Sequence, residues 1–420
     1  MREQLLKYST KLAQAGLCAP GEPLLAALDA DVSFSRADDP RQPVAQQVLH
    51  ELGASALLLA EPVGPCQEAM RILAQAALDT GQDAVTPGDC ETRTFLHDLP
   101  VVDGLDPTAL ARALARRKGC IVLHHGRALM AAAGAVSPEQ TFVTASSVAF
   151  ACFVAYFSRR LRQARQGDLT PYLHRELAHM RDLVEADQKR LPHAPPELMA
   201  GPFSHADQAR AAMAQAGRAV VDYGLVDSSF GNVSCRQASP EGELLLISQT
   251  GSALDELEGL IDPCRMDGTS CVGLTASSEY SAHKAVYDVC GARVILHGHP
   301  RFAVILSMDC EHLDCPGQGG CHRACSRPRA VEDAASGLVA PIVPGEVGAG
   351  PYGLCNTLPP ALASAPAGAG GGRAAIVYGH GLFAAADDDF RPAFAMLLET
   401  ERFCRREYFR RVDALCGAGT

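Results

Sequence analysis

The sequence predicts an α/β protein composed of two domains. Its 420 residues are more than one ordinary hydrophobic core encloses. The segment 191–205 (LPHAPPELMAGPFSH) is rich in proline and interrupts helical periodicity, which predicts a boundary near residue 200. Beyond it, stretches with helical spacing alternate with short apolar runs typical of strands. We therefore expect one domain over 1–195 and a second over 205–420.

The elements of the second domain follow in order from residue 206. A helix over 206–223 carries small apolar residues at helical spacing and ends at Gly224. Short apolar runs predict strands at 244–248, 293–296 and 374–378. Another helix begins after Ser277 and Ser278, whose hydroxyls suit a helix N-terminus. The acidic segment 387–389 opens the last helix, because its charge complements the positive end of the helix dipole.

Composition and charge exclude several classes of function. The 47% hydrophobic and 20% charged residues are typical of a globular protein. The formal net charge of -11 argues against nucleic acid and anionic membrane as partners. The first residues show no apolar core of a signal peptide, and the longest apolar run, Val148 to Phe157, is about half of the roughly 20 residues of a membrane span. We expect a cytoplasmic protein in which this run is a buried helix or a subunit contact.

Histidines at the end of a predicted strand suggest a metal site. In RVILHGHP, His297 and His299 are two residues apart and therefore point to the same side of an extended chain. His380, in IVYGHGLF, lies where another apolar strand ends in glycines. Zinc prefers three or four ligands of this kind. Spacing alone indicates the pair and leaves the third ligand open, because single histidines are more often structural.

A carboxylate near a helix start is a candidate acid/base. In SSEYSAHKAVY, the serines are expected to cap the helix, with Glu279 in its first turn. His283 follows four residues later, on the same helix face. A capping-box carboxylate explains Glu279 equally well when the segment is considered by itself.

Glycine-containing turns provide candidate anion sites. SFGNVS (229–234) and QTGS (249–252) combine glycine with hydroxyl or amide side chains. Backbone N–H groups in such turns, together with a helix N-terminus at Ser277 and Ser278, form a cradle for phosphate. Ordinary turn chemistry explains each segment equally well when it stands alone.

Taken together, the motifs resemble one known family. GNVS, ISQTG, SSE, HGH and GHGLFA occur in this order, and the chain from about Ala206 to Phe409 is similar to the class II aldolase/adducin family, specifically its L-fuculose-1-phosphate aldolase branch. The resemblance implies an α/β/α sandwich around a mostly antiparallel sheet. It also implies a four-fold tetramer with sites between subunits.

The resemblance also implies roles for individual residues. His297, His299 and His380 match zinc ligands, and Glu279 matches the catalytic carboxylate. Phosphate-binding positions are matched by Gly231, Asn232, Thr250, Gly251, Ser277 and Ser278. Tyr352, in GAGPYG, is similar in context to a tyrosine that a neighbouring subunit lends as proton donor.

The implied activity is that of a zinc-dependent lyase acting on a small phosphorylated sugar. Such an aldolase forms or cleaves a carbon–carbon bond in a phosphorylated ketose through an enediolate. Epimerases of the family tend to carry Asp where this chain has Glu279, whereas dehydratases share the three histidines. Three histidines also suit Fe(II) in an oxygenase. A non-catalytic, adducin-like scaffold is the remaining alternative, although such members have lost ligands that this chain keeps.

The first half resembles a degenerate copy of the second. QVLHELGASALLLAEP (47–62) aligns with AVYDVCGARVILHGHP (285–300), and IVLHHGRALMAAA, with His125, aligns with IVYGHGLFAAA. Leu59 and Glu61 replace the paired histidines, and Arg41 stands at the position of Glu279. We therefore expect a catalytically silent first domain. A chain with two copies predicts a homodimer with pseudo-four-fold symmetry.

A cysteine-rich insertion near 309–326 follows the metal strand. Its thiols are close enough in sequence to surround one ion. Zinc, an iron–sulfur cluster and unliganded thiols all stay open for this group, which comprises Cys310, Cys315, Cys321 and Cys325.

Overall fold

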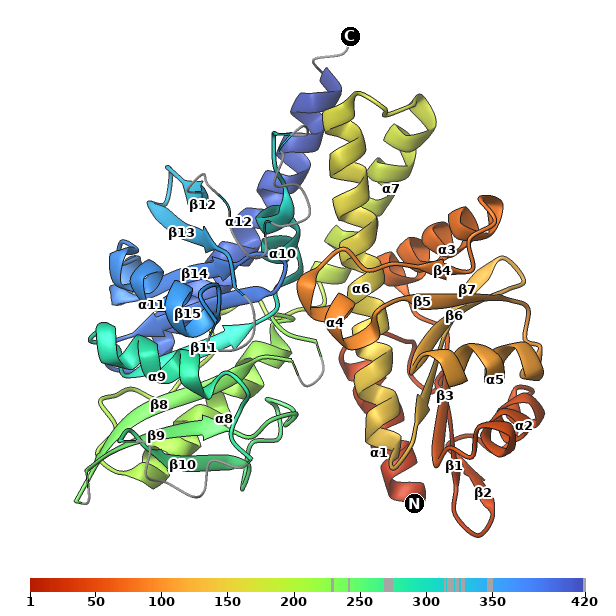
Figure 1. Ribbon diagram of the computed structural model, residues 1–420, viewed down its shortest axis with the longest axis horizontal. Helices are drawn as coiled ribbons and strands as arrows, with labels where there is room; N and C mark the ends of the chain where they lie inside the picture. The colour runs from red at the N-terminus through yellow and green to blue at the C-terminus, as the bar shows by residue number, and fades with distance from the viewer. Residues whose placement is uncertain are drawn as a thin grey trace. The chain divides into compact units, whose positions relative to one another are not determined.

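The computed structural model describes the chain outside residues 228–229, 241, 268–274, 313–314, 316–320, 322–324, 326–328, 346–349 and 418–420. The described chain forms two compact units, Met1–Arg190 and Leu191–Thr420. Each unit has its own sheet with helices on both faces (Figure 1).

The first unit is built on a seven-stranded sheet with the order β2-β1-β3-β7-β6-β5-β4. Adjacent strands are antiparallel except β5 and β6, which are parallel. The strands are β1 (Leu24–Leu28), β2 (Val32–Phe34), β3 (Ala56–Ala60), β4 (Ala84–Val85), β5 (Leu99–Asp103), β6 (Gly119–His124) and β7 (Arg127–Gly134).

Helices cover both faces of this sheet. On one face, α2 and α5 share a buried apolar cluster with β1, β3, β6 and β7. On the other, α1, α3 and α6 contact the same strands (Figure 1). The helices are α1 (Arg2–Gln14), α2 (Gln42–Leu52), α3 (Gly64–Asp79), α4 (Cys90–Leu96), α5 (Pro107–Arg116), α6 (Pro138–Gln166) and α7 (Pro171–Gln188).

The apolar run Val148 to Phe157 lies in the middle of α6. This helix of 29 residues is the one described helix long and apolar enough to cross a membrane, and 89% of its apolar window is buried. It packs against α1, α3 and β7 of its own unit. Helix α6 is therefore the central core helix of the first unit.

The second unit is built on an eight-stranded sheet with the order β10-β9-β8-β11-β15-β14-β13-β12. Among the described strands of this sheet, β13 and β14 are the one parallel pair of neighbours. The strands are β8 (Asn232–Ser239), β9 (Gly242–Ser248), β10 (Ile261–Arg265), β11 (Val294–Gly298), β12 (Arg329–Asp333), β13 (Leu338–Val343), β14 (Arg373–Val377) and β15 (Gly381–Ala386).

This sheet is also the middle layer of a sandwich. Helices α9 and α11 bury apolar side chains against β9, β11, β14 and β15. Helices α8, α10 and α12 contact the opposite face (Figure 1). The helical segments are α8 (Ala206–Asp222), α9 (Tyr280–Val289), α10 (Arg301–Met308), α11 (Leu354–Ser364), the 3₁₀ turn η2 (Ala369–Gly371) and α12 (Phe390–Gly417).

The two units share one topology. Without β10, the order and pairing directions of the second sheet repeat those of the first, and β5–β6 matches β13–β14 as the parallel pair. Leu59 and His297 are each the last residue but one of the central strand. The structure thus confirms the expected α/β/α sandwich in two copies.

The alignment of His125 with His380 does not hold in space. Strand β6 continues to His124, which pairs with Arg127, so that a two-residue turn connects β6 to β7. Both turn residues, His125 and Gly126, have positive φ angles of 49° and 74°. Such angles are typical of a tight type I′ hairpin. His125 is therefore exposed at a hairpin tip, whereas the second unit has a longer turn at His380.

Candidate metal centre and active site

Two histidines converge at one end of β11. His297 lies within the strand, and His299 follows its last residue, Gly298. Alternate residues of an extended chain point to the same side, and the two Nε2 atoms lie 3.0 Å apart. Both imidazoles are buried, with exposed fractions of 1% and 2%.

The third histidine comes from the turn between β14 and β15. The backbone N–H of His380 donates to the carbonyl of Val377 (3.1 Å). The N–H of Gly379 donates to Ser307 Oγ on α10 (2.8 Å), which fixes the turn beside the end of β11. One ring nitrogen from each of the three histidines lies within 4.8 Å of the other two. The fold thus brings together the three residues that the motifs singled out.

Two glycines allow the backbone to approach His297 closely. Gly231 has a φ of 80°, and a Cβ there would lie 2.4 Å from the His297 carbonyl oxygen. A Cβ on Gly381 would lie 2.6 Å from Cε1 of the same histidine. A side chain at Gly231 would therefore displace the backbone of His297, and one at Gly381 would displace its imidazole. The glycines of GNVS and GHGLFA therefore serve the packing of the site.

The structure corrects the expected position of Glu279. Helix α9 begins at Tyr280 with Glu279 as its N-cap residue, whereas the sequence predicted serine caps and Glu279 in the first turn. Its carboxylate points to the histidines: Oε1 is 2.9 Å from His380 Nε2, and Oε2 is 3.5 Å from His297 Nε2. Because the side chain is only 5% exposed, these buried partners replace water as its hydrogen-bonding environment.

Asn232 holds the same carboxylate from β8. Its Nδ2 donates to Glu279 Oε2 at 2.6 Å, and its backbone lies opposite His297 in the sheet. The side chain is 4% exposed. The resemblance associated Asn232 with phosphate, whereas in the structure its amide contacts the carboxylate. Sequence spacing did not reveal this contact, because it depends on the pairing of β8 with β11.

Burial controls the charges of the site. It lowers the pKa of His297 to about 4, although nearby Glu279 opposes the shift. Burial, together with the neighbouring histidines, also puts the pKa of His299 well below its usual value. For Glu279, burial raises the pKa, but His297 and the hydrogen bond from His380 outweigh it, and the pKa falls well below 4.5. At neutral pH the imidazoles of His297 and His299 are therefore neutral, and the carboxylate of Glu279 is ionised.

These groups fit a divalent metal ion. His297 Nδ1 lies 3.1 Å from the carbonyl oxygen of Leu382, which can only accept, so Nδ1 carries the proton and Nε2 offers its lone pair. Zinc with bonds of about 2.0–2.1 Å in a tetrahedron would space its ligand nitrogens by roughly 3.3 Å. The 3.0 Å between His297 and His299 is close to this spacing.

The predicted anion-binding turn 249–252 lies beside the segment that precedes α9. Thr250 donates twice to the segment before α9, from N–H to Thr275 O and from Oγ1 to Ala276 O, both at 2.8 Å. This turn and the segment before α9 form a single rim next to Glu279, since Ser277 Oγ accepts the Glu279 N–H (3.3 Å). Contact with phosphate stays a prediction for Thr250, Gly251, Ser277 and Ser278 of this rim, and for Gly231, which directly precedes β8.

His283 belongs to a polar group behind the carboxylate. Its Nδ1 lies 2.7 Å from Ser234 Oγ, which is also 2.6 Å from the Tyr287 hydroxyl. Burial lowers the pKa of His283 to about 3, so it is neutral. These bonds join α9 to β8 and orient the end of the helix that carries Glu279.

The sequence analysis did not identify Glu401, a residue of α12 that holds the start of α10 just after β11. Its partly buried carboxylate accepts the N–H groups of Phe302 (3.0 Å) and Ala303 (2.8 Å) and so caps α10 directly after His299 and Pro300. Burial raises the pKa of Glu401 to about 7. A contact across about a hundred residues leaves no local pattern in the sequence, so it could not be predicted there.

Tyr352 and the cysteine group stand apart from this geometry. Tyr352 lies two residues before α11 and is 42% exposed, and its role as a proton donor for a neighbouring subunit stays a prediction. In the part of the chain that the structure describes, the three histidines are the one group of three or more His, Cys, Asp or Glu side chains with ligand atoms within 4.8 Å. A second ion therefore stays a prediction for Cys310, Cys315, Cys321 and Cys325, whose intervening residues largely lie outside the described ranges.

Fold and site define the second unit as an α/β/α sandwich with a buried three-histidine centre beside a carboxylate. Residues 211–408 match the family described as Class II Aldolase and Adducin N-terminal domain, so the second unit of the chain belongs to the class II aldolase/adducin family. A comparison with curated proteins finds no match.

Several solved structures are similar to about half of the chain. L-fuculose-1-phosphate aldolase from Thermus thermophilus is 24% identical, with a TM-score of 0.36, over 49% of this chain and 96% of that one. A sugar-phosphate aldolase from Thermotoga maritima is 17% identical, with a TM-score of 0.33, over 49% and 94%. L-fuculose 1-phosphate aldolase from Glaciozyma antarctica is 15% identical, with a TM-score of 0.32, over 52% and 94%.

Proposed function

We propose that this protein is a metal-dependent aldolase that forms or cleaves a carbon–carbon bond in a small phosphorylated ketose. The observation that carries the proposal is the convergence of three buried imidazoles on one ionised carboxylate, Glu279. Such a set can hold a divalent cation and, beside it, accept a proton. The resemblance of the motifs to the L-fuculose-1-phosphate aldolase branch adds sugar phosphates as the substrate class.

The histidines would hold the ion, with zinc as the preferred metal. His297 is oriented for this task by its bond to the Leu382 carbonyl, and His380 by the turn that Ser307 fixes. Once bound, a divalent metal acts as a Lewis acid that polarises the carbonyl group of the ketose. The buried position excludes bulk water, which strengthens every charge interaction in the site.

Glu279 would act as the general base. In the direction of bond formation, its carboxylate accepts the proton from the carbon next to the ketose carbonyl, and the electron pair of that C–H bond is delocalised as an enediolate. This carbon then bonds to the aldehyde carbon, while the aldehyde oxygen gains a proton. Asn232 keeps the Glu279 carboxylate oriented throughout, because its amide donates to Oε2. We propose Tyr352 of a neighbouring subunit, or water, as the source of the last proton.

The rim beside Glu279 would bind the phosphate group. Thr250 and Ser278 are exposed there, and Gly251 has a φ of 75°, a conformation that turns backbone N–H groups outward. Polar contacts at this distance from the reacting carbon contribute binding energy that positions the substrate. The phosphate would distinguish this substrate class from free sugars.

We further propose that the protein is a cytoplasmic homodimer. Two sandwiches of one topology in each chain would supply the four positions of a ring from two chains. Light scattering that reports about twice the chain mass of 44.3 kDa would support this assembly. Four full-length chains in the particle would contradict it.

The proposed function is tested by metal analysis and product analysis together. Purified protein should contain a divalent metal, and chelation should remove its activity. Incubation with a panel of ketose 1-phosphates should release dihydroxyacetone phosphate and an aldehyde from at least one member. Isomeric sugar phosphates of unchanged carbon number would identify an epimerase instead, and metal-free protein would contradict the proposal.

A further inference from the structure

The first unit has a charged network where the second unit has its histidines. Arg41 is the N-cap residue of α2, and Glu279 is the N-cap residue of the corresponding α9. Leu59, on the central strand, takes the place of His297, and Glu61, just beyond the strand, takes the place of His299. The fold therefore places Arg41 and its partners at the position of the metal centre.

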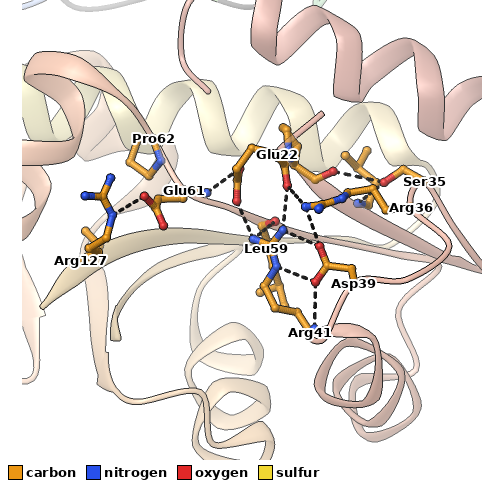
Figure 2. A network of polar contacts seen from close by, with 12 residues as sticks. Glu22, Ser35, Arg36, Asp39, Arg41, Leu59, Glu61, Pro62 and Arg127 are labelled. Carbon is orange, nitrogen blue, oxygen red and sulfur yellow. Dashed lines mark hydrogen bonds and ion pairs between the residues drawn. The ribbon is translucent and has the colours of Figure 1, made fainter. Parts of the chain in front are cut away.

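All five N–H groups of the Arg41 guanidinium are used within the protein. Nε and one Nη2 N–H donate to Asp39 (2.9 and 2.8 Å). One Nη1 N–H and the second Nη2 N–H donate to the carboxylate and the backbone carbonyl of Glu22, both at 2.7 Å. The remaining Nη1 N–H donates to Leu59 O (3.3 Å). Figure 2 shows the guanidinium between Glu22 and Asp39, with no donor left for an external anion.

Burial makes the carboxylates of this network depend on a cation. The Asp39 side chain is 1% exposed, that of Arg41 12% and that of Glu22 22%. Burial raises the pKa of Glu22, and Arg41 opposes the shift. Burial also acts to raise the pKa of Asp39, but the hydrogen bonds from Arg41 reverse it, and the net pKa is lowered. An uncompensated buried charge is far costlier than a paired one.

We propose that the Arg41 guanidinium is an internal cation that takes, in the first unit, the place of a metal ion. The first unit then binds no divalent ion at this position, because the guanidinium of its own Arg41 side chain already supplies the positive charge. Removing the guanidinium converts the pocket into a site for a hard divalent cation, of which Ca²⁺ is the representative.

The acceptor atoms around Arg41 determine which cation would replace it. They are carboxylate oxygens of Glu22 and Asp39 and carbonyl oxygens of Glu22 and Leu59. Ca²⁺ takes six to eight such oxygen ligands in flexible geometry, with water completing the shell. Arg36 Nη1 also lies 2.7 Å from Asp39 Oδ2. Without Arg41, the carboxylates of Glu22 and Asp39 and the guanidinium of Arg36 would remain. The remaining negative charge favours a cation.

Thermal unfolding of the full-length chain in Ca²⁺ tests this inference. The Tm of the wild type should not respond to Ca²⁺, which three imidazoles bind poorly. Arg41→Ala should lower the Tm in Ca²⁺-free buffer, and Ca²⁺ at about ten times its Kd should raise it again by about 3–6 °C. Ca²⁺ titration by calorimetry should give one added site per chain. No readout involves catalysis, so the outcome is independent of the proposed function.

Matched variants separate a vacated cation site from a general loss of charge. Arg127 pairs with Glu61 in the same network but is 56% exposed, so Arg127→Ala should create no Ca²⁺ response. Arg41→Lys restores a cation and should need no Ca²⁺, and Asp39→Asn combined with Arg41→Ala should lose the response. If Arg41→Ala is insoluble, recovery on refolding in Ca²⁺ but not in Na⁺ decides the question in the same way. Stabilisation of the wild type by Ca²⁺, or Arg41→Ala that neither binds Ca²⁺ nor refolds better in it, would overturn the inference.

Discussion

Replacing Glu279 by Gln removes the proposed base while leaving its surroundings nearly unchanged. Gln has the same shape, and its carbonyl oxygen can still accept from His380 Nε2, 2.9 Å away. The amide nitrogen would then face Asn232 Nδ2, which now donates to Oε2 at 2.6 Å. A flip of the Asn232 amide supplies the acceptor that this nitrogen needs. We therefore expect the fold and the histidine cluster to persist.

The expected loss is confined to turnover. A positioned general base contributes about 10²–10⁴-fold to the rate, which corresponds to roughly 3–5 kcal/mol of the activation barrier. Glu279→Gln should therefore lower kcat by this factor while metal content stays at the wild-type level. The assay couples dihydroxyacetone phosphate release to NADH oxidation and is run alongside elemental analysis of the same sample.

Glu279→Asp is the matched control for this substitution. It keeps a carboxylate but withdraws it by one methylene from His380, so its activity should lie between those of wild type and Glu279→Gln. A Glu279→Gln protein that keeps its metal and full activity would refute the role of Glu279 as base.

Four other substitutions test separate parts of the molecule. His297→Ala should lose both metal and activity, which distinguishes a ligand from a base in elemental analysis. His125→Ala should leave metal content and rate nearly intact in the same assays, since His125 lies at an exposed hairpin tip. Cys321→Ser should remove one metal equivalent if the cysteine group holds an ion, whereas unchanged content would leave the thiols unliganded. Glu401 has a folded pKa of about 7 against 4.5 when unfolded, so its contribution to stability is complete below pH 4.5 and is lost as pH rises to 7. In wild type, the free energy of unfolding in urea should therefore fall by on the order of 3 kcal/mol across this pH range. Glu401→Gln should not show this fall.

The sequence predicted the cluster of three histidines because these residues carry local patterns. The spacing of His297 and His299 on a strand determines that they share a side, and the motif order identified His380 and Glu279 as their partners. The predicted sandwich followed from the same family resemblance. The motifs could not predict contacts between segments that are distant in sequence. The contact of Asn232 depends on the pairing of β8 with β11, and that of Glu401 depends on the packing of α12 beside α10.

Other differences arise where two local preferences compete. Serine and glutamate after a turn fit a capping box, yet Glu279 caps no backbone group and turns to buried imidazoles instead. The alignment of His125 with His380 failed because the turn between β6 and β7 is shorter than the turn between β14 and β15. In that hairpin, β6 and β7 pair as far as His124 and Arg127, which leaves no room for an inward-pointing turn residue. Neither outcome changes the hydrophobic pattern from which the strands were predicted.

The two units show how one scaffold accommodates opposite charges at one position. In the second unit, the neutral imidazoles of His297 and His299 and the ionised carboxylate of Glu279 form a site that favours a cation from solution. In the first unit, the carboxylates of Glu22 and Asp39 are already paired with a cation, the guanidinium of Arg41. Arg41 occupies the N-cap position of its helix, as Glu279 does in the second unit. An attached cation satisfies its partners permanently and cannot exchange or bind substrate oxygen. The same replacement that stabilises the first site therefore removes the chemistry that the second can perform.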